Sequence, residues 1–125
     1  MIQKRSDNIK RHPGKWAFTG GAVDAGESSL EGAMREVNEE LGIEVLPENM
    51  EYLISFKREK GFVDVWLLKS DINEDDLKLQ KKEVDMVKWV SLDELDDIIN
   101  SGDFVPSVNL YYELFTRLLK KCHNF

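Results

Sequence analysis

The sequence is poor in cysteine: Cys122 is the single thiol among 125 residues. One cysteine excludes a disulfide within the chain and a metal site built from cysteines. Chains without disulfides are typical of reducing compartments, so we expect a cytoplasmic protein.

Long apolar stretches are also missing. No run approaches the roughly 20 residues that a membrane-spanning helix needs. The first five residues, MIQKR, are not followed by the apolar segment of a secretory signal peptide. We therefore expect no membrane partner.

Positive charge is scarce relative to negative charge. The chain has 17 Lys and Arg against 24 Asp and Glu, a formal net charge of −7. Binding to long nucleic acids needs a basic surface, so we expect neither a nucleic-acid partner nor an RNA-decapping activity. A small phosphorylated ligand stays compatible with this charge, because a bound metal can invert the local field.

The rest of the composition is typical of one globular domain, which we place at residues 1–125. Hydrophobic residues make up 42% and charged residues 33% of the chain. The order of the periodic segments predicts an α/β (α+β) sandwich with helices on both faces of one mixed sheet. The expected strands are 1–5, 15–19, 50–58, 62–69 and 84–90, and the expected helices are 29–41, 92–101 and 107–121.

Several helix ends carry capping signals. Ser28 with Glu31, and Ser91 with Glu94, have the spacing of a capping box. Gly42 follows the first helix, where a left-handed residue is often needed. In the last helix we expect one apolar stripe, made of Leu110, Tyr111, Leu114 and Leu118.

Carboxylates crowd one side of the helix expected at 29–41. Glu36 and Glu40 form a like-charged i,i+4 pair, which costs roughly 0.2–0.5 kcal/mol, and acidic residues in the last turn oppose the helix dipole. A solvated acidic face is one interpretation. The other is a bound Mg²⁺ or Mn²⁺, which removes both penalties and prefers oxygen ligands. The buried face is expected beside the acidic one, at Leu30, Ala33, Met34, Val37 and Leu41.

The segment 21–43, GAVDAGESSLEGAMREVNEELGI, is similar to the Nudix box. Two flanking segments also resemble the family, WAFTG at 16–20 and VKWVSLDEL at 87–95. The resemblance implies a member of the Nudix hydrolase superfamily (MutT/Nudix-type), with a mixed β-sheet flanked by helices. The fixed positions of the box are matched by Gly21, Glu27, Arg35-Glu36-Val37, Glu39-Glu40 and Gly42-Ile43.

Nudix hydrolases cleave a diphosphate that is linked to another moiety. The resemblance therefore implies a metal-dependent hydrolase, with Mg²⁺ or Mn²⁺ as cofactor, acting on a nucleoside diphosphate derivative or a similar small phosphorylated substrate. Glu36 and Glu40 correspond to the main metal ligands, and the carbonyl of Gly20 to an additional one. Glu39 corresponds to a further ligand, or to the group that holds or deprotonates the attacking water.

The remaining box residues are implied to support the site. Arg35 and Glu27 correspond to an ion pair that holds the loop against the helix. Gly21 and Gly42 are expected to serve the turn and the helix cap.

The resemblance also suggests site roles for two residues outside the box. Glu83 lies where several family members place an extra metal-binding or base carboxylate, and its alternative is a solvated glutamate. Arg5 lies where MutT-type members carry an arginine that contacts phosphate.

The chain departs from the family at its start. Family members usually have one or more strands before the segment that begins here at Met1. We therefore expect a first strand that is shortened or missing through N-terminal truncation. The sheet edge would then be open to a second copy in a homodimer.

Two other functions compete with the hydrolase. Residues 3–5 together with 10–16 also resemble isopentenyl-diphosphate isomerases, but those enzymes need a cysteine where Thr19, Gly20 and Gly21 stand here. A non-catalytic Nudix-like module for nucleotide binding or regulation would not require the full set of acidic residues.

Overall fold

A computed structural model describes residues 1–59 and 61–122. One antiparallel sheet has the strand order β2-β1-β5, and the other is a hairpin of β3 and β4. The strands are β1 (Ile2–Arg5), β2 (Trp16–Ala17), β3 (Met50–Arg58), β4 (Gly61–Leu68) and β5 (Val84–Lys88). The helices are α1 (Ser29–Leu41), α2 (Leu92–Asn100) and α3 (Tyr112–Cys122), with short 3-10 helices at Pro47–Asn49, Glu74–Asp76 and Pro106–Leu110.

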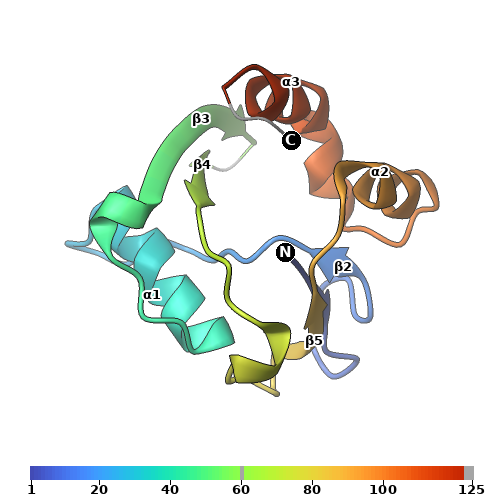
Figure 1. Cartoon of the computed structure of the whole chain (residues 1–125), viewed down its shortest axis with the longest axis horizontal. Coiled ribbons are helices and arrows are strands. Elements are labelled where there is room, and N and C mark those ends of the chain that lie inside the picture. The colour runs from blue at the N-terminus through green and yellow to red at the C-terminus, as the bar shows by residue number, and fades with distance from the viewer. Residues whose placement is uncertain (60, 123–125) are drawn as a thin grey trace.

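Side chains of β1 alternate between two layers of helices. Ile2 belongs to a buried cluster with Leu95 of α2 and with two residues before α3. The next residue, Gln3, pairs with Val87 of β5, and Val87 packs with Leu41 of α1. Since neighbouring residues of a strand face opposite sides, α1 and α2 lie on opposite faces of this sheet (Figure 1). The expected sandwich is confirmed.

β1 is the central strand of its sheet. It is short, but it pairs with β2 on one side and with β5 on the other. Ile2 is 1% exposed and Gln3 3%. The expectation that this strand leaves an open edge is wrong, because both of its edges have backbone partners. The open edge was the reason to expect a homodimer. The homodimer therefore stays a prediction without that support.

The strands form two sheets, whereas a single mixed sheet was expected. A β-bulge between Tyr52 and Ile54 interrupts the β3–β4 register and increases the local twist. The hairpin is attached to the rest of the fold through side chains. Trp66 Nε1 donates to Ser29 Oγ at 2.9 Å, and on the other side the ring of Phe56 stacks on a tyrosine that precedes α3. Figure 1 shows the hairpin between α1 and α3.

The last helix differs from its expected range of 107–121. A 3-10 helix at Pro106–Leu110 comes first, and Tyr111, with φ −138° and ψ −2°, separates it from α3. This break changes which side chains point inward. Leu114 is 49% exposed, whereas Phe115 and Leu119 are buried. The expected stripe is therefore wrong, because it assumed one uninterrupted helical phase.

The first helix has the expected bounds and ends. Ser28 and Glu31 form a capping box, and Gly42 adopts the left-handed conformation with φ 70°. Ser91 and Glu94 form the second expected capping box at the start of α2. None of the helices in the described part of the chain is long and apolar enough to cross a membrane.

We expect Gly42→Ala to destabilise the protein more than Gly102→Ala. Both glycines have positive φ, so an alanine at either costs about 1–2 kcal/mol. A Cβ at Gly42 would also lie 2.7 Å from the Cβ of Lys78, whereas Gly102 has open space around it. Urea unfolding of both variants measures the difference. Equal losses would show that the contact with Lys78 gives way without cost.

Candidate active site

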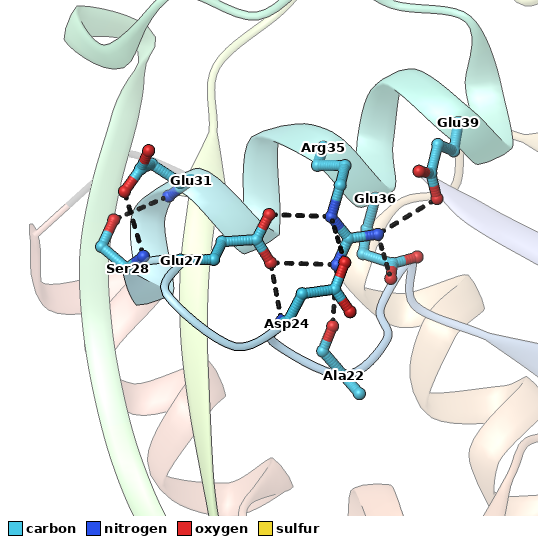
Figure 2. Close-up of polar contacts among 8 residues, drawn as sticks. All are labelled: Ala22, Asp24, Glu27, Ser28, Glu31, Arg35, Glu36 and Glu39. Carbon is cyan, nitrogen blue, oxygen red and sulfur yellow. Dashed lines mark hydrogen bonds and ion pairs between the residues drawn. The ribbon is translucent and has the colours of Figure 1, made fainter.

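Arg35 is the cation around which the acidic side chains of α1 and the preceding loop are arranged (Figure 2). Its Nε lies 2.8 Å from Glu27 Oε2, and its Nη2 lies 3.1 Å from Glu27 Oε1. Nη1 lies 3.1 Å from both Glu36 Oε1 and Glu39 Oε2. Nη2 also donates to the carbonyl oxygen of Ala22 at 2.8 Å. The guanidinium thus joins the loop to two turns of the helix.

The loop before α1 is tied down by Glu27. The backbone N–H of Asp24 donates to Glu27 Oε1 at 2.8 Å, and Asp24 Oδ2 lies 3.4 Å from Arg35 Nε. The hydrogen bond from Arg35 holds the pKa of Glu27 below its usual value. Glu27 therefore stays ionised and links the loop to the helix, as Figure 2 shows.

Glu40 is the buried carboxyl of the site. It is 6% exposed, and within the described residues its Oε2 has no hydrogen-bond partner. Burial is the main reason why the pKa of Glu40 is raised to about 7, and the charges of Glu36 and Glu83 act in the same direction. Hydrogen bonding from Gln3 and from the Gly20 backbone opposes that rise.

Glu36 lies one turn earlier on the same helix and is held by Arg35. Its carboxylate is 15% exposed and bound to Arg35 through Oε1. Burial raises the pKa of Glu36, and Arg35 opposes this rise. The loop passes close by, because a Cβ at Gly21 would clash with the carboxylate of Glu36. Glycine at this position lets the loop approach the carboxylate.

A cavity of about 270 Å³ lies between β1, the loop and α1. It brings together both carboxyls of the i,i+4 pair, both glycines of the turn and both of the expected residues outside the box. Its lining consists of Gln3, Arg5, Ile9, Gly20, Gly21, Glu36, Glu40 and Glu83.

Four expected residues do not line this cavity: Arg35 and Glu27, which form the ion pair described above, and also Glu39 and Gly42. The carboxylate of Glu39 is 55% exposed and pairs with Arg35 on the outer side of α1. Gly42 caps the far end of the helix, where its backbone N–H donates to the carbonyl of Asn38. Gly42 therefore serves the C-terminal end of α1 and not the cavity.

Sequence reasoning missed three residues that the fold brings to the site. Gln3 and Ile9 line the cavity, and Asp24 joins the cluster around Arg35. The signal for Gln3 was available, because strand alternation turns it to the face opposite the apolar Ile2. Nothing local in the sequence marks Ile9.

The donor set fits a divalent metal. The unpartnered Oε2 of Glu40 is a buried oxygen without a donor, and the carboxyls of Glu36 and Glu83 repel it. Hard cations bind such oxygens. In the described part of the chain no three acidic, histidine or cysteine side chains already converge as ligands. Arg35 accounts for part of this, since it holds Glu36 and Glu39.

We expect the metal-free protein to lose stability as pH rises from about 4.5 to about 7. Glu40 ionises at a higher pH in the fold than in the unfolded chain, so its contribution is fully present below that range and lost through it. Glu40→Gln should remove most of this slope and stabilise the protein above the range by up to about 3 kcal/mol.

Urea unfolding in a chelator across this pH range measures the effect. Glu44→Gln is the control, because Glu44 is exposed and lies outside the cavity. A parent and a Glu40→Gln variant with parallel pH profiles would contradict the burial of an ionising carboxyl at this position.

Comparison with known proteins places this geometry in a family. The model of the NUDIX domain matches residues 1–108, which include every residue lining the cavity. An uncharacterised Nudix hydrolase of Listeria monocytogenes is 37% identical over 107 residues, which are 85% of this chain and 63% of that protein.

Solved structures agree with this match. A crystal structure of a protein from Deinococcus radiodurans has a TM-score of 0.69 at 25% identity, covering 83% of this chain and 65% of that chain. A MutT protein from Methanosarcina mazei has a TM-score of 0.66 at 28% identity, covering 93% of this chain and 81% of that one. The chain thus spans less than two thirds of the Listeria and Deinococcus proteins. The family model covers most of the chain and contains the whole cavity, and the chain therefore belongs to the NUDIX domain family.

Proposed function

We propose that the protein is a metal-dependent hydrolase that cleaves the diphosphate linkage of a nucleoside diphosphate derivative or a similar small molecule. The observation that carries the proposal is the buried, unpartnered Oε2 of Glu40 in a cavity shared with Glu36 and Glu83. A buried carboxylate without a donor costs free energy, and a cation in the cavity would offset that cost.

The proposed ligands of Mg²⁺ or Mn²⁺ are Glu36, Glu40 and the carbonyl of Gly20, with Glu83 as an extra ligand or base. When bound, the metal clamps the negative charge of the phosphates and activates a water for attack on phosphorus. Glu39 keeps two proposed roles, a further ligand or the group that holds or deprotonates that water.

Arg5 is the proposed contact to a substrate phosphate. It lines the same cavity, and its Nε donates to the carbonyl oxygen of Arg11 at 3.0 Å. This bond uses one donor of the guanidinium and orients the group at the cavity wall. Its remaining N–H groups can pair with phosphate oxygens in a bidentate manner.

Arg35 and Glu27 are proposed as positioning residues. Their bidentate ion pair holds the loop that carries Gly20 and Gly21 against α1. The loop carbonyl and the helix carboxylates are thereby kept on the same side of the cavity.

The wider setting is part of the same proposal. We propose residues 1–125 as one domain, supported by the contact of Phe115 in α3 with Phe18 beside the loop. We also propose a cytoplasmic location, from the single cysteine.

We expect Glu36→Gln and Glu40→Gln each to lower kcat/KM by at least about 100-fold. Each removes a proposed metal ligand, and the loss of a hydrogen-bonding partner behind a ligand already costs about 10–100-fold. The assay follows phosphate or nucleotide products from a panel of nucleoside diphosphate derivatives with Mg²⁺ or Mn²⁺. Glu44→Gln serves as the matched surface control. Turnover unchanged in either cavity variant would remove the assigned mechanism.

Nucleotide binding by calorimetry separates the hydrolase from the non-catalytic alternative. Binding to the parent without any metal-dependent product from the whole panel would favour a binding or regulatory module.

A further inference from the structure

Gln3 is a polar side chain in the middle strand of the sheet, on the face that α1 covers. It is 3% exposed and lines the cavity beside Glu40. Its position follows from strand alternation, since Ile2 points to the α2 side and Gln3 to the α1 side. A buried amide needs partners for both its oxygen and its nitrogen.

The oxygen of this amide has a partner in Thr19. The hydroxyl Oγ1 of Thr19 donates to Gln3 Oε1 at 2.7 Å. Thr19 immediately precedes Gly20, whose backbone also lines the cavity. The hydroxyl therefore joins the loop of the site to the central strand.

The nitrogen of the amide is the group left for Glu40, which lines the same cavity as Gln3. An ionised carboxylate can only accept hydrogen bonds, so the Gln3 amide must present its NH₂ group to Glu40 and its oxygen to Thr19. Hydrogen bonding from Gln3 to Glu40 acts against the effect of burial on the carboxyl. Because Oε2 is the oxygen without a partner, the amide and the Gly20 backbone leave that oxygen free.

We propose that Thr19 and Gln3 are positioning residues that orient Glu40, so that its free oxygen is presented to a divalent cation. Thr19 fixes the orientation of the Gln3 amide, and the amide fixes the carboxyl. Hydrogen-bonding partners behind a metal ligand commonly orient it in this way. The proposal rests on the metal site of the proposed function and adds two residues outside the Nudix box.

The test is the affinity of the protein for Mn²⁺ alone, without substrate, measured by calorimetry or by the electron paramagnetic resonance of free Mn²⁺. Thr19→Val keeps the shape of the side chain and removes its donor, so affinity should fall about tenfold. Thr19→Ser keeps the donor and should bind Mn²⁺ like the parent. Gln3→Leu should weaken binding at least as much as Thr19→Val.

We call the hydrogen-bonded series Thr19–Gln3–Glu40 the relay. Ser6→Ala is the control, because Ser6 is also buried and its hydroxyl accepts a hydrogen bond from the Asn8 backbone, outside the relay. Equal loss of affinity in Ser6→Ala and Thr19→Val would overturn the proposal. So would unchanged affinity in Thr19→Val, or failure of Thr19→Ser to restore it. Thermal unfolding verifies that each variant is folded, and the Thr19 pair decides the question if Gln3→Leu does not fold.

Glu40→Gln distinguishes a failure of the proposed metal site from a failure of the relay alone. If Mn²⁺ binding depends on Glu40 but not on Thr19, the relay is wrong and the metal site stands. If Mn²⁺ binding does not depend on Glu40, both the metal site and the relay are wrong.

Discussion

Burial of the Glu40 carboxyl is the constraint on which the candidate site depends. The last turn of α1 packs on the sheet through Leu41, which belongs to a buried cluster with Val84 and Val87. Glu40, the residue before it, is carried into the same interface. Its carboxyl is 6% exposed, and one of its oxygens has no partner among the residues that the structure describes. A fold optimised for stability alone would place an apolar residue there. The metal site proposed above would account for a carboxyl at this position.

Arg35 separates the carboxylates of the acidic face of α1 and of its loop into two groups, those that it pairs with and Glu40. Its guanidinium forms ion pairs with Glu27, Glu36 and Glu39. No such cation reaches Glu40 in the described residues, since its partners there are an amide and a backbone N–H. One part of the box therefore ties the loop to the helix, while Glu40 is the carboxyl that we propose for the cation.

Much of the local structure could be predicted because its causes are local. The bounds of α1, its capping box and the left-handed Gly42 depend on neighbours within a few residues. The pairing of Arg35 with Glu27 spans eight positions and was implied by the Nudix box. The last helix was predicted less well, because the break at Tyr111 shifts the helical phase and no proline or glycine marks that position.

Long-range arrangement could not be predicted in the same way. The sequence indicates a strand at 1–5, but its position as the middle strand depends on pairing with β5, more than seventy residues away in the chain. The same holds for the cavity, where Glu83 and Arg5 meet α1 only because β5 and β1 are adjacent.

The sequence by itself determined the family and the helix with its acidic face, since both are written in residues that lie close together along the chain. Only the tertiary structure decided which carboxylates share a cavity, that Glu39 lies exposed, and that Thr19 donates to Gln3 in the wall of that cavity. The physical reason is that burial and charge compensation belong to the packed interface between α1 and the sheet, and no segment of the chain forms that interface alone.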